Sequence, residues 1–443
     1  MKKYICSLLC VLALGITSCD SFLDVQPVGK VIPTSAEEYR ALLAQAYKVI
    51  PSDRGYAGFR SDEMTVAKYE MDQDTYGFLE IWDDSSIKEG NVKFKWVNNY
   101  NVIYFTNQII ENAAKIESND EAVVNQIVGE AHLLRAYMYY LLVNLHGQPY
   151  TLEGGPASKA VPLIWDTDIE KVRTRNTVEE IYTAILKDIE SAKELINVEE
   201  WENKFSYRFN TTSAFALEAR VNLYMAHWQK ALDASKEVLK GKYTLANLSA
   251  EGALVPNHYT STENICAADD AMNSNTTTAA LVAPSFIEKF AADDLRTAIY
   301  FSEPNDDGLR KSKKTGKNEF KTTFRLAEFV LTAAEASAQL NELESARQYL
   351  LLLVEKRYTS EGVARVKAEI ATLNQKDLLQ FIYDERAREF ALEGHRWFDL
   401  RRTTRPQIDK VIGGKKYTLK HNDPRYTIPI PREATQANPN LLL

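Results

Sequence analysis

Cysteine is scarce in this sequence, and its placement excludes a disulfide framework. The 443 residues include only four cysteines. Cys6 and Cys10 lie in an N-terminal segment that we predict to be removed. Cys19 is the first residue after that segment, and Cys266 has no other cysteine near it in the sequence. Because Cys19 is predicted to carry lipid, no pair remains that could close an internal disulfide.

The sequence also lacks the motifs of several metal-binding and catalytic classes. No two of the six histidines lie at metal-ligand spacing, which argues against zinc, and there is no Gly-x-Ser-x-Gly elbow or phosphate loop. Loop aspartates are the remaining candidate ligands, for calcium, but they lack a recognisable loop spacing. We therefore interpret them as solvated side chains and predict no cofactor. These residues are Asp72, Asp74, Asp83 and Asp84.

The sequence also has fewer basic residues than acidic residues. The formal net charge of -8 argues against a nucleic-acid partner, which would need a basic face. Beyond the N-terminus, no apolar run is long enough to form a membrane helix. The hydrophobic content of 45% and the length of 443 residues are sufficient for a large globular core.

The N-terminus carries the features of a lipoprotein signal peptide. Lys2 and Lys3 precede a short apolar run, Ile5 to Leu14, which is too short to span a bilayer. The run leads into Ile-Thr-Ser-Cys19, a branched residue and two small residues before Cys, which resembles a lipobox. We predict a signal peptide over residues 1–18 and a lipid on Cys19, which would hold the mature protein to a membrane. The alternative is an ordinary signal peptide followed by a chance cysteine.

Hydrophobic periodicity predicts a mainly α chain. Capping boxes formed by Ser35 with Glu38 and by Thr177 with Glu180 predict helices that run to Val49 and Ile196. Small and large residues alternate in two segments as they do in interlocking antiparallel helices, which is typical of tetratricopeptide (TPR) repeats. The two predicted pairs are 211–224 with 228–239 and 324–340 with 343–355. The predicted helical scaffold covers about 96–146, 178–240, 323–358 and 376–402.

Two segments lack a clean period. Residues 52–95 and 241–322 contain many aromatic, acidic and small residues. Disordered segments are poor in aromatic residues, so we expect ordered loops, which are frequent places for ligand-binding residues.

The segment Asp377 to Arg402 has two interpretations. Glu385, Glu389 and Glu393 lie four residues apart, on one face of a predicted helix that Gly394 ends, and His395 follows. Carboxylates beside a histidine could act as general acid and base. We favour a buried ion network with neighbouring arginines, because carboxylate ladders on helices are more often structural.

The same segment resembles the C-terminal helix of the SusD/RagB family of Bacteroidetes outer-membrane lipoproteins, which typically reads ERRREFAFEGHRWFDLRR. This sequence has ERAREFALEGHRWFDLRR from Glu385 to Arg402. The stretch from Gly129, GEAHLLRAYMYY, is similar to the family's GEARFLRAYYYF, and Tyr426 to Pro431, YTIPIP, is similar to its closing signature. At Gln148 the chain departs from the usual aspartate.

The resemblance implies a SusD-like fold, in which TPR-like helices over 19–443 display irregular loops. It also implies a surface-exposed lipoprotein of the outer membrane that binds a nutrient, most often a glycan, without covalent chemistry. The implied partner is a TonB-dependent transporter of the SusC type, over which such a protein sits as a lid.

The residues suggest where such a ligand would bind. Aromatic faces stack on sugar rings, and Tyr56, Tyr76, Trp82 and Tyr259 lie in the irregular segments. Burial beneath the loops is an equally good interpretation of each. Two other functions stay open: a glycoside hydrolase that uses Glu385 or Glu389, and a TPR scaffold lipoprotein of the cell envelope with protein partners only.

Overall fold

The computed structural model of this chain describes residues 33–85 and 90–443. The predicted signal peptide, residues 1–18, and the predicted lipid site, Cys19, therefore lie outside the described residues. Among the described residues, no helix is both long enough and apolar enough to cross a membrane.

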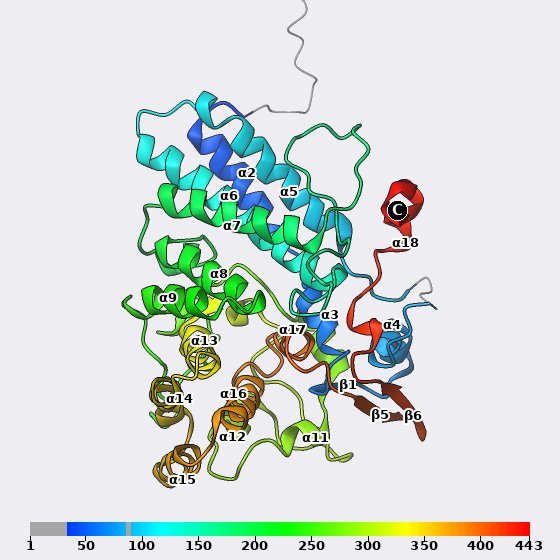
Figure 1. The fold of residues 1–443 in the computed structure, drawn as a ribbon, viewed down its shortest axis with the longest axis vertical. Coiled ribbons are helices and arrows are strands. Elements are labelled where there is room, and N and C mark those ends of the chain that lie inside the picture. The colour runs from blue at the N-terminus through cyan, green and yellow to red at the C-terminus, as the bar shows by residue number, and fades with distance from the viewer. Residues whose placement is uncertain (1–32, 86–89) are drawn as a thin grey trace, which may run out of the picture.

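Four helices form one end of the molecule (Figure 1). They are α2 (Ala36–Lys48), α5 (Trp96–Glu111), α6 (Glu121–His146) and α7 (Val178–Leu195). Both predicted capping boxes are confirmed, because Ser35 and Thr177 each accept a hydrogen bond from the third helical residue. A short 3₁₀ turn, η2 (Ala113–Lys115), follows α5. Helix α6 is buried along nearly all of its last five turns, which makes it the central helix of this group.

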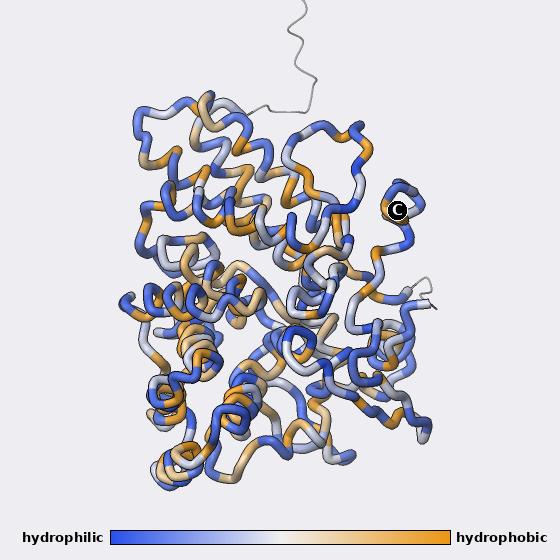
Figure 2. Tube along the Cα trace, viewed as in Figure 1, coloured by the Kyte–Doolittle hydropathy of each residue, from blue (hydrophilic) through white to orange (hydrophobic). Residues whose placement is uncertain are grey.

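The predicted helix pairs are confirmed. The first consists of α8 (Thr211–Tyr224) and α9 (Trp228–Leu239), and the second of α13 (Leu326–Gln339) and α14 (Leu343–Arg357). The turns between partners contain Ala226 and Asn341 in the left-handed region, with φ of 58° and 63°. Helix α13 packs against α9 as well as α14, so the two pairs stack although 86 residues, 240–325, separate them in sequence. Figure 2 shows hydrophobic and hydrophilic stretches alternating along these helices.

The two irregular segments hold short elements and pack against each other. Residues 52–95 form α3 (Asp53–Gly58), β1 (Met64–Val66) and α4 (Glu70–Glu80). The second segment forms β2 (Asn264–Cys266), α10 (Ser274–Ala279), β3 (Ala280–Val282), α11 (Pro284–Ile287) and α12 (Arg296–Tyr300). Strand β1 pairs antiparallel with β3, and β2 pairs with β4 (Phe324–Arg325). Two 3₁₀ turns, η3 (Asn203–Phe205) and η4 (Asn318–Phe320), lie nearby in sequence.

The end of the chain differs in part from expectation. Helix α15 (Ser360–Ala371) was not predicted, and α16 (Gln375–Glu389) ends one turn before Glu393. Gly394 has a φ of 75°, as predicted for a left-handed stop, and a Cβ there would lie 2.7 Å from that of Arg54. Short α17 (Arg396–Arg402) follows.

A hairpin and a tail complete the fold. Strands β5 (Ile408–Ile412) and β6 (Lys415–Leu419) are joined by Gly413 and Gly414, both with positive φ, as two-residue hairpin turns require. The C-terminal tail contains η5 (Pro424–Tyr426), α18 (Arg432–Ala437) and η6 (Pro439–Leu442).

Candidate functional site

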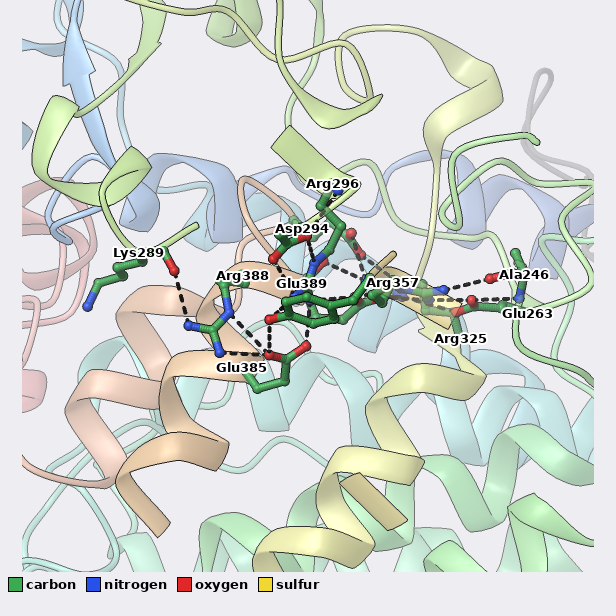
Figure 3. A network of polar contacts seen from close by, with 12 residues as sticks. Ala246, Glu263, Lys289, Asp294, Arg296, Arg325, Arg357, Glu385, Arg388 and Glu389 are labelled. Atoms are coloured by element: carbon green, nitrogen blue, oxygen red, sulfur yellow. Dashed lines mark hydrogen bonds and ion pairs between the residues drawn. The ribbon is translucent and has the colours of Figure 1, made fainter. Parts of the chain in front are cut away.

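The carboxylates of the C-terminal segment lie in a buried ion network (Figure 3). Glu389 accepts hydrogen bonds from Arg325 at 2.6 Å and from Arg357 at 2.8 Å. Glu385 accepts a hydrogen bond from Arg388 at 2.7 Å and forms an ion pair with Arg296 at 2.7 Å. The side chains of both glutamates are fully buried. A buried ion network is therefore confirmed, but of the nearby arginines expected to face these carboxylates, Arg388, Arg396 and Arg401, only Arg388 does so.

The electrostatics of this network oppose acid catalysis. Burial alone would raise the pKa of Glu385, but Arg296 and Arg388 outweigh it and lower the pKa to about 2. Burial also opposes ionisation of Glu389, and Arg357 and Arg325 hold its pKa well below the usual range. A hydrolase using these residues needs an open cleft and a raised carboxyl pKa. The structure contradicts both requirements.

The network also has a structural role that the sequence did not reveal. Glu393 lies beyond α16 and pairs with Lys314, from the irregular segment, and with Arg325 at 2.8 Å. Glu263 pairs with Arg357 at 2.5 Å. Segments far apart in sequence thus meet at α16, which fixes the irregular segment 241–322 to the helical scaffold.

Three of the four predicted ligand-binding aromatics are buried. Tyr56 and Tyr76 are each 6% exposed and pack with Phe59, whose ring stacks on Tyr76 at 5.1 Å. Trp82 is 1% exposed, and its indole N–H donates to the backbone carbonyl of Arg60 at 2.8 Å. These rings fill the core beneath the loops, because the two irregular segments close over them. The proposal of a platform at Tyr56, Tyr76 and Trp82 is therefore corrected.

Tyr259 lies elsewhere, half-exposed, between two adjoining cavities of about 260 and 450 Å³. Both cavities are lined by Tyr259, Asn203 and Ser206, and we call them together the Tyr259 groove. The ring of His258 stacks on Tyr259 at 5.0 Å, and the backbone N–H of Tyr259 donates to the carbonyl of Glu319 at 2.9 Å. These contacts fix the orientation of the ring.

Residues 199–210, which lie inside the predicted scaffold range 178–240 but between its helices, supply part of the lining of the smaller cavity. The guanidinium of Arg208 lies 4.0 Å from the ring centre of Phe205 and 4.9 Å from that of Trp201. The indole N–H of Trp201 donates to the carbonyl of Phe209 at 3.0 Å. Trp201 and Arg208 both line the cavity, so a flat aromatic surface lies beside a cluster of donors.

Amide and phenol groups also line the smaller cavity. Asn210 donates to the hydroxyl of Tyr243 at 3.0 Å. Asn264 donates to the carbonyl of Tyr259 at 2.9 Å, while its own Oδ1 is buried with no hydrogen-bond partner. An unpaired buried acceptor is costly, and a ligand hydroxyl would satisfy it.

The lining of the groove suits ligand binding, and neither of its cavities is lined by a pair of carboxylates from the part of the chain that the structure describes. Of the described residues, one carboxylate lines each cavity: Glu200 the smaller and Glu319 the larger. Glu200 is paired with Lys242, and Glu319 lies 3.5 Å from Lys317. Glycoside hydrolysis normally needs two carboxylates on either side of one bond. The lining instead combines aromatic faces with hydrogen-bonding groups, the combination that recognises sugar rings.

Tyr69 is an exposed aromatic residue that the sequence analysis did not select. It is 72% exposed and lies between β1 and α4, next to Lys68, which pairs with Asp307 of the second irregular segment. No sequence signal distinguishes Tyr69 from the buried Tyr56 and Tyr76. Its exposure makes it a second place where a ring could stack on a ligand.

A larger cavity, of about 850 Å³, lies between the start of α5, residues 162–173 and the C-terminal tail. Its half-buried rings, Trp96 and Tyr100, pack on each other at 5.0 Å. Its exposed hydrophobic residues are aliphatic: Val97, Ile169 and Val172. Aliphatic side chains offer no ring face on which a sugar could stack, so we take the Tyr259 groove as the better sugar site.

Metal-binding geometry is absent from residues 33–85 and 90–443, where no group of three or more His, Cys, Asp or Glu side chains could hold an ion. Of the candidate calcium ligands, Asp84 instead forms a 2.7 Å ion pair with Arg60.

Comparisons with known proteins point to one family along the whole chain. A family model described as "Starch-binding associating with outer membrane" matches residues 21–223, and one described as "SusD family" matches residues 217–442. A curated relative, SusD-like protein P25 of Formosa agariphila, is 22% identical, with 96% of this chain and 95% of the relative covered.

Solved structures show the same fold. A SusD superfamily protein from Bacteroides thetaiotaomicron matches with a TM-score of 0.77 and 21% identity, covering 92% of this chain and 99% of that one. A laminarin-binding SusD-like protein matches with a TM-score of 0.63 and 19% identity, covering 84% of this chain and 92% of that one.

Proposed function

This chain belongs to the SusD family, and from that premise we propose that it binds a glycan without changing it covalently. The observation that carries the proposal is the Tyr259 groove, where aromatic faces and hydrogen-bonding groups converge and each cavity has a single lining carboxylate. Sugar rings present apolar C–H faces and hydroxyl edges, and this lining complements both.

Two features of the family model and the sequence support a place at the outer membrane. The model that matches residues 21–223 is described as associating with the outer membrane, and the lipobox ends at Cys19. We propose that lipid on Cys19 holds the protein at the cell surface. Captured glycan then passes to a partner transporter of the SusC type, which pull-down from an outer-membrane extract would test.

Native gels containing polysaccharides test the binding directly. The chain from Asp20 onward keeps every described residue, and laminarin and starch belong in the panel because relatives are described by them. We expect at least one glycan to retard the protein. Replacing Tyr259 by Ala removes the ring between the cavities and should lower the affinity about 10- to 100-fold, since aromatic contacts contribute about 1–3 kcal/mol.

Tyr69→Ala is the matched comparison, because it removes an exposed tyrosine outside the groove, at the alternative place for stacking. It should leave retardation unchanged. Loss of retardation in Tyr69→Ala with normal retardation in Tyr259→Ala would place the site near β1 and α4 and overturn the assignment. If no glycan is retarded and a stable protein partner other than a transporter is recovered, the chain serves as a scaffold lipoprotein.

A further inference from the structure

A second cavity, remote in sequence from the Tyr259 groove, has an unusually charged wall. It has a volume of about 340 Å³ and is lined by residues of α16, α17 and the start of β5. Four of its lining residues, Gln380, Thr404, Gln407 and Asp409, are exposed, and we place the mouth of the cavity at them. We call it the α17 cavity.

The charges on the wall of the α17 cavity neutralise one another. Three bases face three aspartates: Arg396 contacts Asp62 at 2.7 Å, Lys289 contacts Asp384 at 3.0 Å and Arg386 contacts Asp399 at 3.2 Å. A fourth aspartate, Asp409, pairs with Lys416 at 3.2 Å. The wall therefore attracts neither a strong anion nor a strong cation. It presents charged groups that hydrogen-bond more strongly than neutral ones.

One of these groups is incompletely satisfied. Arg386 is 1% exposed, and its Nη1 is buried without a hydrogen-bond partner. A buried, unpaired guanidinium N–H is costly, and Arg386 lines the cavity, so an acceptor placed there would stabilise it. Carboxylate oxygens have about four lone-pair sites, so the aspartates of the wall still accept hydrogen bonds from a ligand.

We propose that the α17 cavity binds a single neutral sugar ring. Hydroxyl groups both donate and accept, which matches an unpaired Arg386 N–H beside aspartates with acceptor capacity to spare. The volume lies at the lower end of the range for small-molecule sites, about 300–1,000 Å³, and suits one ring better than a chain. An anionic sugar is disfavoured, because each base of the wall is already paired with an aspartate.

This site does not depend on the Tyr259 groove. The two lie on different elements, and they share no lining residue. The protein would hold one sugar at the α17 cavity whether or not a longer glycan occupies the groove. A single experiment can therefore distinguish failure of one site from failure of the other.

Titration calorimetry of the chain from Asp20 onward with D-glucose, D-galactose and D-mannose tests this proposal. We expect one neutral sugar to bind with one-to-one stoichiometry and a Kd of about 1 mM. Thr404→Trp and Gln407→Trp place an indole at the mouth and should each weaken binding at least about tenfold. Gln436→Trp places the same indole on an exposed residue outside the cavity and should bind as the parent does. D-glucuronate should bind about tenfold more weakly than the neutral sugar.

Three results would overturn the proposal: no neutral sugar binds the parent at about 50 mM, both indole variants bind as the parent does, or Tyr259→Ala removes the binding. The last result would assign the sugar to the groove. Because Thr404 and Gln407 are exposed, circular dichroism should show that both indole variants fold.

Discussion

At the scale of single residues, stability is concentrated where charges are buried in pairs. Arg296, Arg325 and Arg357 all pair with Glu389. Each of them also pairs with a carboxylate on another segment, so one substitution disturbs several contacts. Breaking a buried pair by removing one partner leaves an uncompensated charge. The network is therefore a place where a conservative change should have a large effect on folding.

Glu389→Gln tests this account. The substitution keeps the shape of the side chain but removes the charge that Arg325 and Arg357 face, so the free energy of unfolding should fall by about 3–5 kcal/mol. Urea denaturation measures the change. Glu344→Gln is the control, because Glu344 is 76% exposed and lies 3.6 Å from Arg347, and it should cost less than about 1 kcal/mol. Equal effects of the two variants would argue against a structural network.

The carboxyl group of Glu63 should make the stability of the folded protein depend on pH. Burial raises its pKa to about 8, although one oxygen accepts a hydrogen bond from the backbone N–H of Leu392 at 2.9 Å. Between the unfolded value of 4.5 and about 8, the folded state therefore binds the proton more tightly than the unfolded state does. The contribution of Glu63 to stability is lost as pH rises through this window.

Glu63→Gln mimics the protonated side chain and should remove that loss. Its free energy of unfolding should decline less between pH 5 and pH 8 than that of the parent, by about 1–3 kcal/mol. Denaturation curves at several pH values give this difference. Identical slopes for variant and parent would show that Glu63 does not titrate in this window.

At the scale of secondary structure, close approach of helices sets the arrangement of the scaffold. A Cβ on Gly129, in the middle of α6, would lie 2.9 Å from the backbone nitrogen of Ile196, at the end of α7. Backbone atoms cannot yield as the tip of a side chain can. The glycine of the GEAHLLRAYMYY stretch is therefore required by packing between α6 and α7.

Gly129→Ala should destabilise the protein by about 1–3 kcal/mol, although alanine is the better helix former. Gly77 in α4 is the control, because a Cβ there would meet only the side chain of Gln73, at 3.0 Å. Gly77→Ala should be neutral or stabilising by up to about 1 kcal/mol. Melting temperatures of the two variants test the account, and a stabilised Gly129→Ala variant would contradict it.

Local signals predicted the scaffold well. The capping residues of α2 and α7 and the periodic pairs α8 with α9 and α13 with α14 are properties of short stretches, and the structure confirms them. The predicted end of α16 was one turn too late. Glu393 lies beyond the helix and pairs with Lys314 and Arg325, which come from distant segments.

The candidate site was harder to predict, because exposure of an aromatic residue depends on the whole fold. Tyr56 and Tyr259 both lie in irregular segments of similar composition, yet pairing of β1 with β3 buries one and leaves the other half-exposed. Trp201 and Arg208 join Tyr259 only through folding. An aromatic and basic stretch after a predicted helix was the only signal of that part of the lining.

At the scale of the whole molecule, helices hold two irregular segments together and leave a groove and a charged cavity open to solvent. The carboxylates most suggestive of catalysis lie inside this scaffold, while the groove offers rings and hydrogen-bonding groups. This separation supports capture of a ligand, with the charged groups of α16 serving the fold. The central claim is that a glycan binds in the Tyr259 groove and leaves it unchanged.

The most direct test is calorimetric titration of the glycan that retards the protein most, followed by chromatography of the glycan recovered from the same cell. The account predicts saturable binding by the parent, weaker binding by Tyr259→Ala, and a recovered glycan of unaltered chain length. A shortened glycan that depends on the protein would contradict the claim of binding without reaction. Equal binding by parent and Tyr259→Ala would contradict the site.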